Sequence, residues 1–318
     1  MIPPFKSFPL SARLTLTGAM FLFNYLLLFP SVGALAILPF YNMDIEKVYS
    51  VLSGHFITSG DKYALLFVQF IGSVGAFVLT SLLMAQLESV FVAKRLGVIL
   101  RPSFKMIAIA VISIFASQLL IQFLGELNQK IPLPEVLKKL EELGKQSEET
   151  EAALLKGSSI LMFLANTVVL AVVPAIGEEL FFRGIILGDL LKSRVNPVVA
   201  IVSTGLLFSL AHMQFNNILA IWVLGSFLGY LYYISGSLWL SVIAHFTNNF
   251  LLILLKYIYN AGFIKTDIAE ADMPLYATLV SIALFLVCVL VLHKWRRPVD
   301  FELELADPDL TNEENYSE

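Results

Sequence analysis

Long apolar stretches recur along the whole chain and leave few folds open to it. A membrane-spanning helix needs about 20 mainly apolar residues, and eight stretches approach or exceed that length: 14–38, 63–92, 104–124, 158–177, 197–213, 217–234, 237–256 and 274–292. Only 14% of the 318 residues are charged and 58% are hydrophobic, whereas soluble domains carry about 25% charged residues. The sequence therefore predicts an all-α membrane protein with about eight transmembrane helices, of which 197–213 and 217–234 are the shortest.

Lysine and arginine residues predict how the chain crosses the membrane. They are dense in the short loop 93–103 and at the end of the last stretch, Lys294 to Arg297, and loops rich in these residues stay in the cytoplasm. An even number of helices then places both termini there. The stretch 14–38 is longer than the roughly 7–15 apolar residues of a signal peptide, so we read it as the first span. Short loops favour a bacterial inner membrane, with an archaeal or endoplasmic-reticulum membrane as the alternative.

Polar segments divide the chain into five parts. Three spans occupy 1–125, a four-helix core occupies 158–256, and the last span lies in 257–299. Between them, residues 126–157 place leucines at helical spacing opposite lysines and glutamates, which predicts either an amphipathic helix on the outer surface or a solvated helical hairpin. Residues 300–318 hold eight acidic and no basic residues, which predicts a disordered tail.

Composition also limits the partners of the chain. A basic stripe with interleaved aromatic residues, which nucleic-acid binding would need, is missing from the sequence, so we expect no nucleic-acid partner. The single cysteine, Cys288, cannot form an intramolecular disulfide or a multi-cysteine metal site. The expected surroundings are a lipid bilayer and, from the site described next, a peptide or membrane-protein substrate. The oligomeric state is left open.

Three charged residues interrupt the apolar run of the fourth stretch. Glu178, Glu179 and Arg183 follow it directly, and each charge at membrane depth costs roughly 2.5 to 3.5 kcal/mol on insertion scales. Glu179 and Arg183 are four residues apart with the acid first, which favours a pair on one helix face. Glu178 is left without a local partner, so its carboxyl can act as a general base and acid. The alternative is a charge cluster at the membrane interface.

Two further polar groups lie in later apolar stretches. Phe208 precedes His212 by four residues. If the fourth helix runs on to about 191 and the chain turns at 192–196, Glu178 and His212 lie at similar depth. His245 and Asn249 are also four residues apart and share one helix face, whereas Asn248 points to another side and is predicted to be structural. Counting residues along straight helices leaves His245 roughly 10 Å from the depth of His212.

These three pairs carry a resemblance to a known family. Glu178-Glu179-X-X-X-Arg183, Phe208-X-X-X-His212 and His245-X-X-X-Asn249, in this order on apolar helices, resemble the motifs of the CAAX-protease and bacteriocin-processing family, also called CPBP or Abi. The resemblance covers about 158–256. It implies an eight-helix intramembrane endopeptidase acting on a membrane-associated or lipidated peptide. Glu178 and His212 would activate water, His245 and Asn249 would stabilise the oxyanion, and Glu179, Arg183 and Phe208 would support the site.

The motifs leave two questions open. Glu178, His212 and His245 could supply three ligands to one divalent metal such as Zn²⁺, or they could act without metal, which suits an amide at position 249 better. The fold could also serve a non-catalytic peptide-binding, immunity or scaffold protein, although such a binder has no need of a glutamate beside two histidines. A transporter is a third possibility, but transporters usually show repeated halves, and no internal repeat is evident here.

Overall fold

The computed structural model describes residues 5, 8–132, 134–135, 138–267, 274–297, 299 and 301, and within them every regular element is a helix. Seven of these helices are long and apolar enough to cross a membrane. The prediction of an all-α, multi-pass membrane protein is therefore confirmed. The stretch predicted as the fifth span forms only the 15-residue helix Pro197–Ala211, which is shorter than the seven and follows a tight turn at 193–196.

In the described residues, the N-terminal half holds three spans and three further helices. The first span comprises α1 (Leu10–Phe23), η1 (Asn24–Leu28), α2 (Phe29–Ile37) and η2 (Leu38–Tyr41), and α3 (Ile45–Leu52) follows it. The second comprises α4 (Ser59–Ser73), η3 (Val74–Leu79) and α5 (Thr80–Glu88), with α6 (Val92–Arg95) in the loop after it. The third is α7 (Phe104–Gln129), and α8 (Lys138–Leu155) connects it to the next span.

The C-terminal half begins with one long helix, Ile160–Lys192. It comprises α9 (Ile160–Asn166), η5 (Thr167–Val172), α10 (Val173–Glu179), η6 (Leu180–Leu187) and α11 (Gly188–Lys192). Then follow α12 (Pro197–Ala211), η7 (Phe215–Asn217), α13 (Ile218–Ser235), α14 (Leu238–Asn260) and α15 (Leu275–Lys294). The long helix ends at Lys192, close to the end at about residue 191 that the depth comparison of Glu178 and His212 assumed, so the glutamate pair lies in its middle.

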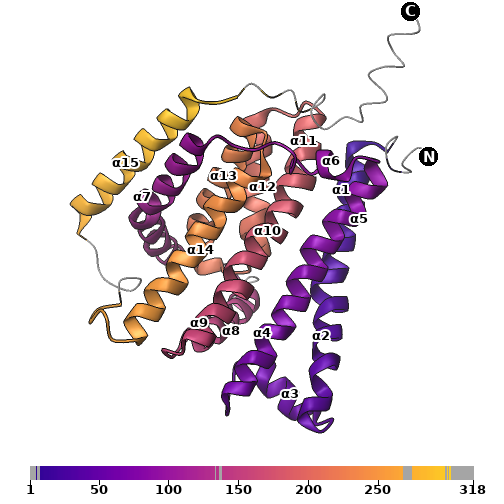
Figure 1. The fold of residues 1–318 in the computed structure, drawn as a ribbon, viewed down its shortest axis with the longest axis vertical. Coiled ribbons are helices and arrows are strands. Elements are labelled where there is room, and N and C mark those ends of the chain that lie inside the picture. The colour runs from indigo at the N-terminus through magenta and orange to yellow at the C-terminus, as the bar shows by residue number, and fades with distance from the viewer. Residues whose placement is uncertain are drawn as a thin grey trace, which may run out of the picture.

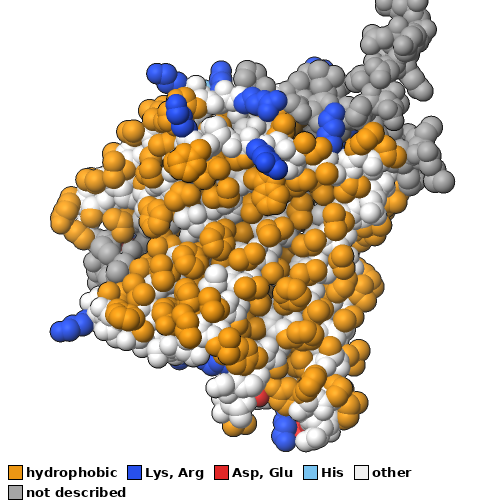
Figure 2. All heavy atoms as spheres, viewed as in Figure 1, with side chains coloured by type: hydrophobic (Ala, Val, Ile, Leu, Met, Phe, Trp, Pro, Cys, Tyr) orange, Lys and Arg blue, Asp and Glu red, His pale blue; other side chains and the backbone are white. Residues whose placement is uncertain are grey.

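Figure 1 shows how these helices are layered. The long helix, α12, α13 and α14 lie in the centre, with α1 to α5 on one side and α7 and α15 on the other. Figure 2 shows a broad apolar surface between the two ends of the molecule, with lysine and arginine side chains gathered at the end where α6 and α11 lie. An apolar belt between polar ends is the surface that a bilayer requires.

The long helix is locally irregular on both sides of the glutamate pair. The segments η5 and η6 are π-helical and flank α10, and Pro174 at the start of α10 removes one backbone donor. Short π-helical segments are frequent at functional sites because they rotate the following residues relative to a regular α-helix. Here they set the directions in which Glu178, Glu179 and Arg183 leave the helix.

Two glycines let α12 and α13 cross closely. A Cβ atom at Gly205 would lie 2.4 Å from the hydroxyl of Ser226, and one at Gly225 would lie 2.9 Å from the ring of Phe208. Small residues at crossings allow such close backbone approach in membrane proteins. The crossing brings the backbone of Gly225 and the ring of Phe208 next to the long helix.

The segment between the third and fourth spans forms the single helix α8 in its described part, and not the hairpin that was one alternative. It packs against η7, α9 and α14 and covers the end of α12, where a Cβ at Gly144 would lie 2.3 Å from the carbonyl oxygen of Met213. The tail predicted from residue 300 lies outside the described residues except for Phe301, which is buried against Tyr232 and Tyr233.

Candidate active site

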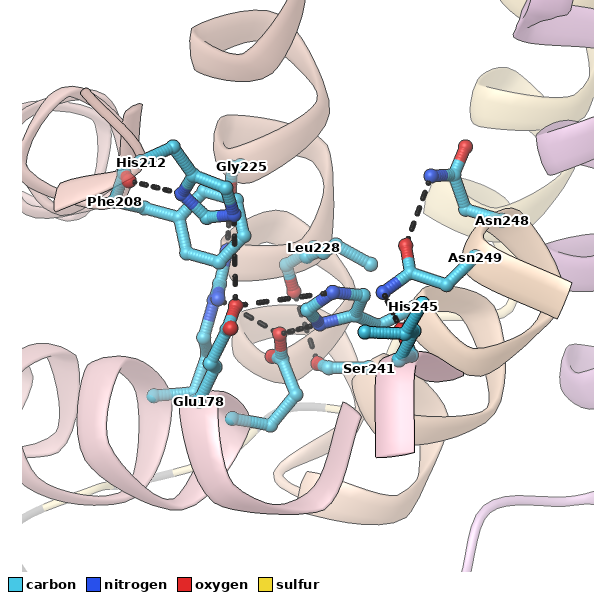
Figure 3. Close-up of polar contacts among 12 residues, drawn as sticks. Glu178, Phe208, His212, Gly225, Leu228, Ser241, His245, Asn248 and Asn249 are labelled. Carbon is cyan, nitrogen blue, oxygen red and sulfur yellow. Dashed lines mark hydrogen bonds and ion pairs between the residues drawn. The ribbon is translucent and has the colours of Figure 1, made fainter. Parts of the chain in front are cut away.

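A cavity of about 1060 Å³ lies between the central helices and is lined by at least one polar residue of each of the three motifs. Glu178 enters it from α10, His212 from the end of α12, and His245 and Asn249 from α14. Figure 3 shows these side chains pointing toward one another. The described lining of the cavity is mainly apolar but includes several carboxylates, amides and histidines, and it contains neither lysine nor arginine.

Glu178 stands between the two histidines. Its Oε2 atom lies 3.8 Å from Nε2 of His212 and 3.9 Å from Nε2 of His245. That oxygen is buried and has no hydrogen-bond partner among the described residues. A buried acceptor without a partner is rare and costly in a folded protein. It can therefore accept a hydrogen bond from a water molecule or a substrate, or it can take up a proton.

Each histidine ring is oriented by a hydrogen bond at its Nδ1 atom. His212 Nδ1 donates to the carbonyl oxygen of Phe208 at 2.8 Å, and His245 Nδ1 donates to Glu179 Oε1 at 2.8 Å. Both acceptors lack a hydrogen of their own, so each Nδ1 carries the proton. In the neutral rings both Nε2 atoms are then proton acceptors that face Glu178.

The supporting residues form a buried layer beneath this trio. Arg183 donates to Glu179 at 2.8 Å and to the carbonyl oxygen of Gly225 at 2.7 Å, so the predicted pair of Glu179 and Arg183 is present. Both side chains are completely buried. The ring of Phe208 lies against Arg183, with its centroid 4.7 Å from the guanidinium carbon, and it also contacts both histidine rings. Glu179 thus accepts hydrogen bonds from both Arg183 and His245.

Asn249 lies one helical turn beyond His245 on the same wall of the cavity. Its Nδ2 atom donates to the carbonyl oxygen of Leu170 at 3.2 Å, while its Oδ1 atom accepts from Asn248 Nδ2 at 3.2 Å. An amide nitrogen carries two hydrogens, so this bond to Leu170 leaves one for a ligand. Asn248, which sequence reasoning treated as structural, also lines the cavity and bonds directly to Asn249.

The mismatch in depth that residue counting gave for His245 and His212 is absent from the structure. Both Nε2 atoms lie within 3.9 Å of one carboxylate oxygen. Counting along straight, parallel helices fails here because His212 follows the end of a short helix and the long helix contains two π-helical segments. Tilts and irregular ends of this kind come from packing and leave no simple trace in the spacing of apolar residues.

Other residues that line the cavity were not predicted from the sequence. Glu151 of α8 and a polar row on α7, formed by Gln118, Gln122 and Glu126, line the same cavity. The row recurs at every fourth residue of an otherwise apolar helix, which is a pattern that could have revealed it. For Glu151 the sequence holds no such signal, because it lies among other exposed charges of an amphipathic helix.

The fit of a metal ion can be judged from the donor set. Two imidazole nitrogens and one carboxylate oxygen are suitable zinc ligands, and both rings have the partnered Nδ1 atom common in metal sites. Their separations of 3.8 and 3.9 Å are wider than the roughly 3.3 Å between ligands of a tetrahedral zinc ion with bonds of about 2.0 Å. Among the described residues no group of three or more potential ligands is close enough to hold a metal ion as it stands.

Fold and site together define a class: a helical membrane protein whose glutamate and two histidines converge in an internal cavity. Residues 160–251 match the family model described as "Rce1-like: Type II CAAX prenyl endopeptidase Rce1-like". This segment spans the three motifs, and the match agrees with their resemblance to the CAAX-protease and bacteriocin-processing family. No curated protein and no solved structure matches the chain. The match supports, in general terms, a CAAX-type intramembrane protease.

Proposed function

We propose that the protein cleaves a peptide bond of a membrane-associated or lipidated substrate within this cavity, and that Glu178 is the general base. The observation that carries the proposal is the buried Glu178 Oε2 atom, which has no hydrogen-bond partner among the described residues and faces two histidine nitrogens. A water molecule between Glu178 and His212 would donate one hydrogen to each. Its lone pair would then be directed at the substrate carbonyl.

The hydrogen-bond partners of the two rings support different roles for them. His245 donates to a carboxylate, Glu179, which stabilises a ring carrying a second proton and so allows Nε2 to donate to an oxyanion. His212 donates to a neutral carbonyl, which gives no such charge compensation and suits a ring that accepts from water. Asn249 would supply the second donor to the oxyanion.

The proposed reaction balances without a further reactant. The water oxygen attacks the peptide carbonyl carbon while Glu178 takes a proton, and the carbonyl oxygen becomes an oxyanion held by His245 and Asn249. When the tetrahedral intermediate collapses, the carbon–nitrogen bond breaks and Glu178 returns its proton to the leaving amine. The products are one peptide with a new carboxyl end and one with a new amino end. Zn²⁺ chemistry at the same donors is the alternative mechanism.

The test uses purified protein in detergent micelles and a panel of fluorogenic peptides with and without a prenyl group. We expect cleavage by the wild type and a loss of about 10²- to 10⁴-fold in the Glu178→Ala variant, which is the range for general-base catalysis. Cleavage products identified by mass spectrometry would locate the scissile bond. A correctly folded Glu178→Ala protein that still cleaves would overturn the base assignment, and tight peptide binding without cleavage by the wild type would favour the non-catalytic alternative.

A further inference from the structure

A chain of side-chain amides crosses the protein behind Asn249. Gln118 Nε2 on α7 donates to Asn248 Oδ1 at 3.3 Å, and Asn248 Nδ2 donates to Asn249 Oδ1 at 3.2 Å. Asn249 Nδ2 in turn donates to the carbonyl oxygen of Leu170 on η5 at 3.2 Å. The chain therefore links three separate elements, α7, α14 and the long helix, through the residue proposed to hold the oxyanion (Figure 3 shows its bond between Asn248 and Asn249).

Backbone carbonyls fix the direction of every amide in this chain. Gln118 Nε2 also donates to the carbonyl oxygen of Ile114 at 2.9 Å, and Leu170 accepts at the other end. A carbonyl oxygen can only accept, so Gln118 and Asn249 must both turn their nitrogen toward it. Asn248 between them is then also fixed, since its oxygen meets a donor and its nitrogen meets an acceptor. Rotating any one amide by half a turn would place two like groups together.

The carbonyl of Leu170 is available for a reason that is visible in the sequence. In an α-helix it would accept from the N–H of the residue four positions later, which is Pro174. Proline has no N–H, and the helix is π-helical at this point. The proline in the motif-bearing helix thus removes the α-helical donor for the carbonyl to which Asn249 is anchored.

We propose that Gln118 and Asn248 are positioning residues for the oxyanion donor Asn249, and this inference rests on the proposed function. An oxyanion donor is effective only when its hydrogen is already directed at the place where charge develops. With one hydrogen of Asn249 bound to Leu170, the plane of the amide is fixed, and the second hydrogen has one direction. Asn248 is buried, with 7% of its surface exposed, and all three amides line the cavity, so the chain lies in the wall of the proposed reacting site.

The competing explanation is that these amides only join α7 to α14, as interhelical hydrogen bonds do in many membrane proteins. The two explanations predict different kinetics. A bond that merely joins helices affects stability and leaves the turnover of the folded protein intact. A positioning role lowers kcat with little change in KM, because the bond improves only the transition-state contact.

The experiment compares Gln118→Met and Asn248→Ala with Ser117→Ala as the matched control. Ser117 precedes Gln118 on α7 and also donates to the carbonyl oxygen of Ile114, at 2.9 Å, but it is not among the residues that line the cavity. We expect the first two variants to lower kcat about tenfold, the scale at which residues that orient a reacting group act, with KM and thermal stability near wild type. The control should keep its kcat. Equal losses in all three variants, or unchanged kcat with lower thermal stability in the first two, would overturn the proposal.

A double-variant cycle on the same substrate adds an independent check. If Gln118 and Asn248 act through Asn249, then adding either change to Asn249→Ala should lower kcat by less than about twofold, since the group that they orient is already gone. Full multiplication of the separate losses would show that they act elsewhere. Single-turnover assays with excess enzyme keep the slow variants measurable. An Asn249→Ala protein with wild-type kcat, beside an inactive Glu178→Ala protein, would refute the oxyanion role and leave the protease itself standing.

Discussion

Two clusters of buried charge in the described part of the chain can be compared. The first, which we call the catalytic cluster after its proposed role, contains Glu178, Glu179, Arg183, His212 and His245. The second, which we call the Arg95 cluster, joins Arg13, Glu88, Arg95 and Asp189 at the end of the molecule where α6 and α11 lie. Both use the long helix, because Asp189 and the carbonyl oxygen of Gly184, which accepts from Arg95 at 2.8 Å, belong to it.

The clusters differ in charge balance. In the Arg95 cluster two arginines meet two carboxylates, and Arg95 donates to both Glu88 and Asp189. None of the four residues lines the catalytic cavity. In the catalytic cluster one arginine faces two glutamates, and it pairs with Glu179 alone. The comparison suggests that a balanced, enclosed cluster fixes the position of helices, whereas an acid without an arginine partner beside a cavity is free for chemistry.

Removing Glu178 should produce the largest effect on activity and the smallest on stability. We expect Glu178→Gln to lower kcat by about 10²- to 10⁴-fold while its thermal unfolding temperature stays at or above that of the wild type, because a buried group without a partner costs free energy. Glu126→Gln, which lies in the same cavity, is the control and should remain active. A large fall in unfolding temperature for Glu178→Gln would remove the distinction between the clusters.

Removing Arg95 should have the opposite result. Arg95→Ala leaves Glu88 without its arginine and Asp189 with Arg13 alone, and breaking a buried pair typically costs about 3–5 kcal/mol. We expect a clearly lower unfolding temperature and lower yield, with kcat per folded molecule close to the wild-type value. Circular dichroism during heating, together with an assay corrected by active-site titration, measures both quantities. Lost turnover in a stably folded Arg95→Ala protein would show that this cluster also serves catalysis.

Arg183 belongs to a buried ion pair and also supports the proposed active site, so its replacement should lower both stability and activity. Arg183→Ala leaves Glu179 buried without its arginine, so we expect a loss of stability of about 3–5 kcal/mol together with lost activity, because Glu179 also orients His245. The double variant Glu179→Gln with Arg183→Met removes both charges and should recover much of the stability without recovering activity. If it is no more stable than Arg183→Ala, the charge-pair explanation is wrong.

Asn249 distinguishes the metal-free mechanism from the zinc alternative. We expect Asn249→Ala to lower kcat by about 10²- to 10³-fold, the cost of one oxyanion donor, with the zinc content of the purified protein unchanged and well below one per chain. Elemental analysis of the wild type and of His212→Ala measures this directly. Stoichiometric zinc that is lost in His212→Ala, with reversible inhibition by chelators, would establish the zinc mechanism at the same residues.

The smallest expected effect concerns the charge of the substrate. Glu151 of α8 lines the cavity, and Glu151→Lys should shift preference several-fold from peptides with a basic residue near the scissile bond toward acidic ones, an electrostatic effect of about 1 kcal/mol. Glu151 is exposed by surface area, and desolvation by the surrounding protein raises the pKa of its carboxyl, against the opposing effect of His212. The wild-type preference should therefore strengthen as pH rises through this raised value. Glu149→Lys, on the exposed side of α8, is the control and should leave the preference unchanged.

Sequence reasoning was most successful where the relevant geometry is local. Glu179 and Arg183, Phe208 and His212, and His245 and Asn249 are each four residues apart, and helical periodicity alone places such residues on one face. The bond from Arg183 to Glu179 and the bond from His212 to the backbone of Phe208 are both present. It was least successful for Asn248, because the residue that gives it a role, Gln118, lies 130 positions earlier on another helix.

The sequence by itself determined that this chain crosses a membrane repeatedly and that charged and imidazole side chains lie within its apolar helices, because hydrophobic length and residue spacing are properties of a short segment. Only the tertiary structure decided which glutamate meets which partner. Glu179 turns to Arg183 and His245, Glu178 turns to the cavity, and Glu151 reaches that cavity from a separate helix. These directions depend on the π-helical turns, on a proline, and on the glycines at which two helices cross closely. Through these features, the packing of the whole bundle fixes the rotation of each helix.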